Sequence, residues 1–281
     1  MATRPDPKPG AQVAIAFAAD GDGRTYIDRQ RVTYPFHICR PHYLDAAPPG
    51  LASLYIQSCS GGLYENDSLE LDFATGAGAE VYVTTQSPTV VHSMPNGAAR
   101  QRVSVAAGEG SHVEYVPDPQ VLFPNSRLQS NVHVRLADGA TAIIADAFLR
   151  HDPKQNGGVF SSYTSEIVIG GATGETLAID RLAIDGSLFA SEHPGISGRF
   201  RAQATLIVAR RGGIPHAVSA ALEQVPCSDQ AAIGISRLPN SAGIVVRMLA
   251  ADGVSLRQVL QACWATARFA LKGAYPAERR K

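Results

Sequence analysis

The chain is poor in charge and carries no excess of either sign. Its 281 residues include 25 Lys and Arg against 25 Asp and Glu, so the formal net charge is zero, and charged residues make up 18% of the chain. A balanced surface offers no general attraction to nucleic acid or to an anionic membrane, and we expect neither as a partner. The small number of charged residues also indicates that partner proteins cover part of the surface.

Long apolar runs are absent, and none approaches the roughly 20 residues that a membrane span needs. The apolar segment from Val13 to Ala19 follows basic residues, as in a signal peptide, but it is too short for the core of one. It continues through Asp20-Gly21-Asp22-Gly23 into Arg24 to Ile27, which predicts a β-hairpin. We therefore expect a cytoplasmic protein, with a polar and disordered tail over residues 1–12.

Cysteines are few, and the usual catalytic signatures are missing. The sequence has no P-loop, GxSxG, HExxH or Rossmann fingerprint. Ser60-Gly61-Gly62 resembles a glycine-rich loop but lacks the strand–loop–helix setting of a phosphate site. His37 and His42 are close in sequence, yet two ordinary surface histidines explain them better than a metal site does. The cysteines are too far apart for a zinc site or a disulfide framework, so we expect reduced, buried thiols at Cys39, Cys59, Cys227 and Cys263.

What is present is a mainly β pattern with a weak internal repeat. Short alternating runs fill residues 13–200, and four segments read strand, glycine turn, strand at intervals of about 30 residues. Glycine suits such turns because it accepts a positive φ without strain. The pattern predicts a β-helix or solenoid-like body of stacked hairpins. The turn glycines are Gly78, Gly110, Gly139 and Gly174.

The repeat also predicts a line of polar groups. The position seven residues past each turn glycine is Thr85, Pro117, Asp146 and Arg181, with Asp180 one step earlier. If the units stack in register, these residues form a track along one edge of the body. A slip of one residue would move Asp180 to the opposite face.

Residues 201–281 have a different residue pattern, which predicts an α+β portion packed on the body. The predicted order is β-α-β-β-α, which places two helices against a short sheet. Ser255 is the expected N-cap of the last helix, whose apolar stripe includes Trp264. The strands are expected over Gln203–Ala209, Ala231–Leu238 and Gly243–Leu249, and the helices over Pro215–Gln224 and Ser255–Leu271.

Three aspartates could form a weak path for a metal ion. A protein that passes on an ion such as Ni²⁺ needs oxygen ligands that bind weakly, because a nitrogen or sulfur site would trap the ion. Asp67, Asp146 and Asp180 are candidates, although each taken alone also fits a capping or turn carboxylate.

Several motifs together resemble the urease accessory protein D family, called UreD or UreH. The strongest is the segment Ser60 to Asp72, SGGLYENDSLELD, and Val113 to Leu128 resembles another family segment. Asp146 falls on an acidic position of the family. The further residues that fall on family motifs are Gly61, Gly62, Asp67, Leu69, Gly76 to Ala79, Thr84, Thr85, Gln86, Leu149, Arg150, Asp180, Arg181, Leu182, Trp264 and Arg268.

This resemblance implies a β-helix-like scaffold with two helices and no catalytic activity. It implies binding to the accessory protein UreF, through UreF to the GTPase UreG, and docking on nickel-free urease. No cofactor would be held tightly, and Ni²⁺ would be in transit through an internal passage. The family positions that line this passage carry over to Asp67, Thr89, Asp146 and Asp180.

Two other functions fit the pattern of residues. A β-solenoid carbohydrate hydrolase or lyase could use Asp118, Asp146 and Asp180 as acid/base carboxylates. Aromatic residues are 7% of the chain and include one Trp, which argues against a groove for stacking sugars. A structural or adhesive β protein is the third possibility, and it would be favoured by export.

Overall fold

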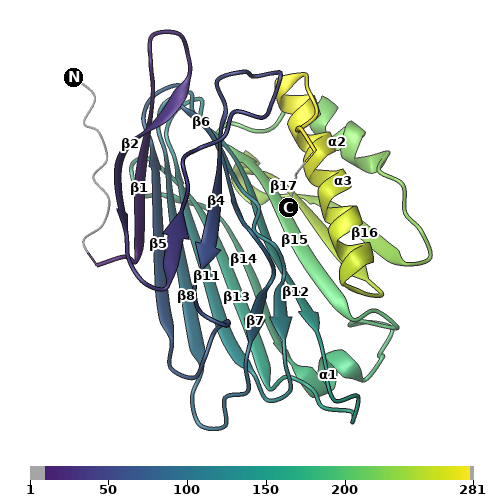
Figure 1. The fold of residues 1–281 in the computed structure, drawn as a ribbon. Helices are drawn as coiled ribbons and strands as arrows, with labels where there is room; N and C mark the ends of the chain where they lie inside the picture. The colour runs from purple at the N-terminus through teal and green to yellow at the C-terminus, as the bar shows by residue number, and fades with distance from the viewer. Residues whose placement is uncertain (1–9, 279–281) are drawn as a thin grey trace.

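The computed structural model describes residues 10–278, which form two β-sheets stacked face to face, with the two C-terminal helices on the outer side of one sheet (Figure 1). The first sheet has seven strands. In spatial order they are β14 (Thr176–Asp185), β13 (Ser162–Gly171), β11 (Arg127–Leu136), β8 (Ala99–Ala107), β5 (Ser68–Thr75), β1 (Val13–Ala19) and β2 (Thr25–Val32).

The second sheet has ten strands, eight of them in a continuous order. These are β16 (Ala231–Arg237), β17 (Gly243–Ala250), β15 (Ala202–Arg210), β12 (Thr141–Arg150), β9 (His112–Tyr115), β6 (Glu80–Thr85), β4 (Ala52–Ser58) and β3 (Phe36–Ile38). Two short strands extend the sheet beside β12: β10 (Gln120–Leu122) pairs with β12 and with β7 (Thr89–Val91).

Successive coils of the chain build both sheets at once, which confirms the solenoid-like prediction. The chain runs up a strand of the first sheet, turns at a glycine, and descends a strand of the second sheet. Strands β5, β8, β11 and β13 therefore stack in parallel, as do β4, β6, β9 and β12. The turn glycines Gly78, Gly110 and Gly139 have φ of 66°, 62° and 70°, values that glycine adopts without strain. The predicted hairpin is also present, because β1 pairs antiparallel with β2.

The fourth repeat breaks the pattern, and the prediction of one common edge is wrong for it. Gly174 closes a tight hairpin, in which the Gly174 N–H donates to the Gly171 carbonyl at 3.2 Å. The chain therefore turns back within the first sheet, and β14 pairs antiparallel with β13. Asp180 and Arg181 thus lie on the first sheet, whereas Asp146 lies on the second.

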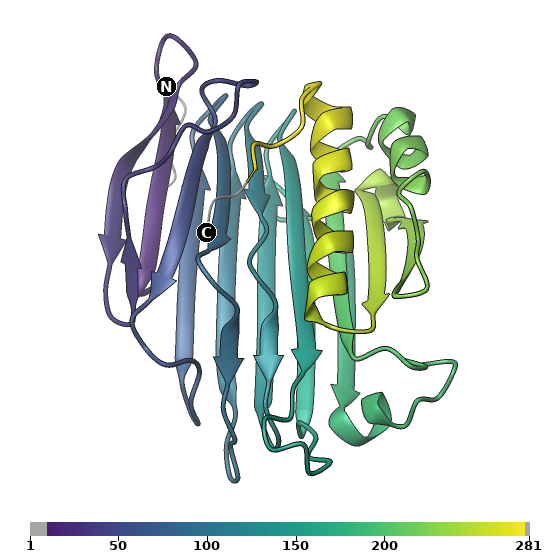
Figure 2. The ribbon, with the colours of Figure 1, turned by 45° about the vertical axis from the view of Figure 1, so that its right-hand side comes forward.

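Three α-helices occur in residues 10–278: α1 (Gly186–Ala190), α2 (His216–Glu223) and α3 (Gly253–Lys272). The two predicted C-terminal helices, α2 and α3, are present, and Figure 2 shows α3, in yellow, against the later strands of the second sheet. The apolar stripe predicted for α3 is buried, including Trp264. The N-cap prediction is wrong by three residues, because the Asp252 side chain accepts from the Ser255 N–H. Helix α1 was not predicted; it is a single short segment capped by Asp185.

The predicted division of the chain stays a prediction, but its parts can be located. Residues 1–9 of the expected tail lie outside the described residues. Gln12, placed in the same tail, accepts from the Glu70 N–H with its side chain at 2.7 Å. The portion after residue 200 shares a sheet with the body, since β15 pairs along β12. In the described part of the chain, no helix combines the length and apolarity needed to cross a membrane.

The prediction of buried thiols is wrong for three of the four cysteines. Cys39, Cys59 and Cys227 are exposed, because each lies in a connection outside the strands and helices. Cys263 alone is buried, in the apolar stripe of α3, and burial raises the pKa of its thiol to about 12.

The hydrophobic core consists of three apolar clusters. One apolar cluster between the two sheets includes Val132 and Ile144, and a second includes Leu128 and Phe148. A third lies between the second sheet and helices α2 and α3. Along β12, Asp146 separates Ile144 from Phe148 on the inward face, so a polar layer divides the two inner clusters.

Candidate functional site

The polar layer contains one row of side chains on the first sheet. Ser130 of β11 lies directly opposite Gln101 of β8 and Ser165 of β13. Ser130 and Ser165 are buried, and Gln101 is half-buried. Because these three residues are in register on neighbouring strands, the row runs across the strands, in the direction in which the coils stack.

A second row faces it from the other sheet. Asp146 of β12 lies opposite Thr205 of β15, which lies opposite Arg247 of β17. Neighbouring strands are about 4.8 Å apart, so this row extends about 10 Å from Asp146 to Arg247. The polar layer is therefore internal and is formed by both sheets, and of the residues in the predicted track this second row contains Asp146.

Asp146 is the centre of the layer. Its Oδ1 accepts from the Ser130 hydroxyl at 3.2 Å and its Oδ2 from the Tyr163 hydroxyl at 2.6 Å. The pKa of Asp146 is raised, mainly because the side chain is buried and also because the Asp180 charge is near. Hydrogen bonds from Ser165, Tyr163 and Ser130 lower this pKa, but they do not outweigh the burial. The atoms available as metal ligands around Asp146 are hydroxyl and carboxylate oxygens, which bind a transition-metal ion weakly.

Clusters of the kind that hold a metal firmly are not found here. Within residues 10–278, no group of three or more His, Cys, Asp or Glu side chains is placed to bind a metal ion. The layer can therefore contact a cation through oxygen ligands but does not enclose it with imidazole or thiolate.

One end of the layer opens at a groove between the sheets. Asp180 reaches this end from β14, and both of its carboxylate oxygens contact the Arg247 guanidinium, with Nη1 3.4 Å from Oδ2. The groove beside the pair has a volume of about 460 Å³. Its apolar lining includes Leu182, Ile184, Phe189, Met248 and Leu249.

The layer continues in the other direction through amide groups. The Gln101 Nε2 donates to the Tyr115 hydroxyl at 3.5 Å, and the Gln120 Nε2 donates to Gln101 Oε1 at 3.3 Å. The Gln120 Oε1 is buried without a hydrogen-bond partner among the described residues. Beyond it, the Asp118 N–H donates to the Thr85 hydroxyl at 2.8 Å.

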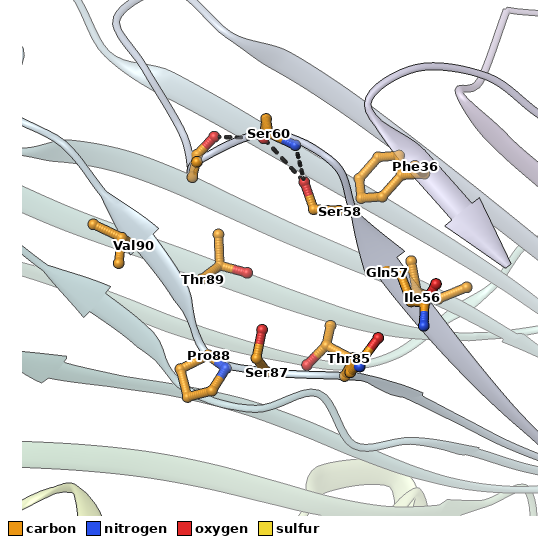
Figure 3. A pocket seen from close by; sticks show the side chains of 13 residues that line it. Phe36, Ile56, Gln57, Ser58, Ser60, Thr85, Ser87, Pro88, Thr89 and Val90 are labelled. Atoms are coloured by element: carbon orange, nitrogen blue, oxygen red, sulfur yellow. Dashed lines mark hydrogen bonds between the residues drawn. The ribbon is translucent and has the colours of Figure 1, made fainter. Parts of the chain in front are cut away.

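At this second end, a cavity of about 250 Å³ opens where strands of the second sheet are interrupted. Strand β6 ends at Thr85, and β7 begins at Thr89 after a short corner. Figure 3 shows Thr85 at the end of β6, Ser87 in the corner and Thr89 in β7 lining this space, with Ser58 and Ser60 facing them. The cavity and the groove lie at opposite edges of the second sheet, and the polar layer runs between them.

The two motif glycines form part of the cavity wall. Gly62 has φ of 133°, and a Cβ built there would lie 2.2 Å from the Val90 carbonyl oxygen. Glycine is therefore required for the close approach of this loop to β7, where the Leu63 N–H donates to that carbonyl at 2.8 Å. The neighbouring Gly61 carbonyl contacts the His92 ring at 3.0 Å.

The remaining predicted residues lie apart from the layer. Asp67 closes a local turn, because its Oδ2 accepts from the Tyr64 N–H at 2.8 Å. Thr84 is buried and donates to the Val116 carbonyl, while Gln86 is exposed at the cavity rim. Arg181 lies on the outer face of the first sheet, paired with Glu166.

Trp264 and Arg268 belong to a second polar cluster, beneath α3, whose other members sequence reasoning missed. Glu114 accepts from the Trp264 Nε1 at 2.6 Å and from the Arg268 Nη2 at 2.6 Å. Arg268 also donates to Asp45 at 2.9 Å, and His112 contacts Glu114 at 2.7 Å. All five side chains are buried.

Opposite charges face each other in this cluster. Burial raises the pKa of Glu114, but the Arg268 charge and the His112 hydrogen bond outweigh it and lower the pKa to about 2. A signal for this cluster is present in the sequence. His112 and Glu114 are two residues apart in β9, so both side chains lie on the face of the strand that packs against the apolar stripe of α3. The cluster fixes α3 on the sheet and is separate from the polar layer.

Comparison with known proteins gives a consistent result. The family model described as UreD urease accessory protein matches residues 10–281. A Urease accessory protein UreD 1 of Pseudomonas syringae pv. syringae is 40% identical over 271 residues, covering 95% of this chain and 94% of its own length. The similarly named protein of Pseudomonas syringae pv. tomato is 39% identical, covering 96% and 95%. A Urease accessory protein UreD 3 of a Bradyrhizobium species is 37% identical, covering 97% and 96%.

Proposed function

The chain belongs to the UreD urease accessory protein family, and on that premise we propose that it is a scaffold that delivers Ni²⁺ to nickel-free urease. As a member of this family it is a maturation factor and not an enzyme. We further propose that it works in the cytoplasm, bound to UreF and through UreF to the GTPase UreG, with no tightly held cofactor of its own.

The polar layer is the observation that carries the proposal. It extends from the cavity at Thr89, through Asp146, to the groove at Asp180. Its ligands are oxygens, which exchange Ni²⁺ more readily than imidazole or thiolate would. The apolar clusters on both sides of Asp146 would keep the ion within the layer. Openings at opposite edges suit a protein that receives the ion from one partner and releases it to another.

The carbohydrate hydrolase or lyase is not supported. The carboxylates it would need are already engaged, since Asp180 is paired with Arg247 and the Asp118 carboxylate accepts from the Thr85 hydroxyl at 3.4 Å. Family membership also identifies an accessory protein and not a sugar-cleaving enzyme.

The test is the nickel content of urease matured in cells with variants of this chain. Asp146→Asn removes the charge while keeping the size and most hydrogen bonds of the side chain. We expect it to lower nickel per urease active site several-fold, with urease activity falling in proportion. The matched control is Asp138→Asn, whose side chain is 81% exposed, far from the layer.

The Asp146→Asn chain should bind UreF as the wild type does. This control distinguishes a defect in the metal path from a defect in assembly of the complex. Urease that is fully loaded with nickel in cells lacking this chain would refute the proposed function. Normal loading with Asp146→Asn would refute the role of the polar layer.

A further inference from the structure

Arg247 places a permanent positive charge at the groove end of the layer. Its guanidinium contacts both oxygens of Asp180, which comes from the opposite sheet. In its own sheet it is in register with Thr205 and, through it, with Asp146. The pair thus spans the space between the sheets at the point where the layer meets the groove.

A guanidinium and a metal ion compete for the same oxygens. Arginine stays protonated at any physiological pH, and its fork of N–H donors matches the two oxygens of a carboxylate. A divalent cation at Asp180 would need those oxygens and would also be repelled by the adjacent charge. Asp180 is therefore closed to Ni²⁺ while Arg247 occupies it.

The two side chains differ in freedom to move. The Asp180 side chain is 11% exposed, whereas that of Arg247 is 49% exposed. Arg247 also lines the groove of about 460 Å³. It can therefore turn toward solvent while Asp180 stays in place, which leaves the carboxylate free at the end of the layer.

We propose that Arg247 is a positioning residue that keeps Asp180 from retaining a divalent cation, so that Ni²⁺ reaches Asp180 only when the guanidinium has left it. This inference rests on the proposed function, since it assumes that the ion passes along the polar layer. It gives Arg247 a role in that passage which the sequence motifs did not indicate.

The test compares Ni²⁺ binding by the purified full-length chain and its variants at neutral pH. Arg247→Met keeps the length of the side chain and removes the charge, and we expect Ni²⁺ affinity to increase at least 10-fold. Arg247→Lys restores a cation and should bind like the wild type. The double variant Arg247→Met with Asp180→Asn should lose the gain.

The matched control is Arg181→Met, which removes an arginine from the outer face of the same strand as Asp180 and should leave Ni²⁺ binding unchanged. Thermal unfolding of all variants identifies any that fail to fold. Equal Ni²⁺ affinity of folded Arg247→Met and wild type would overturn the inference, as would a gain that survives Asp180→Asn.

Failure of the proposed function is seen separately, in the nickel content of urease. If Asp146→Asn lowers that content while Arg247→Met binds Ni²⁺ like the wild type, the passage stands and the role of Arg247 is refuted. If Asp146→Asn leaves the content unchanged, the passage itself is refuted.

Discussion

Replacing Glu114 by Gln should strongly destabilise the fold without touching the polar layer. The substitution keeps the shape of the side chain but removes the charge that Arg268 faces. Both residues are buried, so the Arg268 guanidinium would be left with Asp45 as its counter-charge. Removing one partner of a buried ion pair commonly costs about 3–5 kcal/mol when the other charge is left uncompensated, and because Asp45 still pairs with Arg268 we expect a loss near the lower end of that range.

The pKa of Glu114 gives an independent magnitude. It is lowered from 4.5 to about 2 in the folded chain, and each unit corresponds to about 1.4 kcal/mol, which gives about 3 kcal/mol of stability. Because the folded-state pKa is the lower one, this stability is present above pH 4.5 and is lost as the pH falls toward 2. The gap in unfolding free energy between wild type and Glu114→Gln should therefore be constant near neutrality and shrink below pH 4.5.

Urea unfolding measures both effects. The sequence has one tryptophan, Trp264, which donates to Glu114 itself, so fluorescence should be checked against far-UV circular dichroism. The control is Glu70→Gln, which breaks an exposed pair with Arg102 and should cost no more than about 1 kcal/mol. A loss below about 1 kcal/mol for Glu114→Gln at pH 7, or a gap that stays constant down to pH 3, would contradict the reasoning.

Three further outcomes are expected. Gly62→Ala should lower the unfolding free energy by about 1–3 kcal/mol, because of its positive φ and the close Val90 carbonyl; Gly21→Ala, which meets nothing within 4 Å, is the control in thermal unfolding. Alkylation of the native chain should modify the three exposed cysteines and spare Cys263, as counted by mass spectrometry. Because burial raises the pKa of Asp146, protons should compete with Ni²⁺, so binding measured by titration should strengthen with pH, and Asp146→Asn should flatten that dependence.

Local signals in the sequence were sufficient for the coils and the last helices. The short alternating runs predicted the strands of the body, and Gly78, Gly110 and Gly139 marked turns where the chain passes between the sheets. The spacing of Gly78, Gly110 and Gly139 also singled out Asp146, although the prediction placed it along an edge of the body and not in the interior. These features depend on neighbours in the chain, which periodicity and turn chemistry report directly.

Contacts between distant segments were beyond that reasoning. The repeat at Gly174 has the same local pattern as the others, but the hairpin at its turn sends β14 back along β13. The pairing of Asp180 with Arg247 depends on that reversal. Likewise, 154 residues separate Glu114 from Arg268, and nothing near Glu114 in the sequence specifies its partner.

The two polar clusters inside this chain differ in what they contribute to stability. Beneath α3, both oxygens of Glu114 accept charge-assisted hydrogen bonds, and the cluster holds the helix in place. In the polar layer, Asp146 has a raised pKa and the Gln120 Oε1 has no partner among the described residues. An unpaired buried acceptor costs about 1–3 kcal/mol, and apolar residues in this layer would join the two inner clusters. Retaining polar groups there weakens the fold, which is expected of residues kept for function and supports the proposed passage of Ni²⁺.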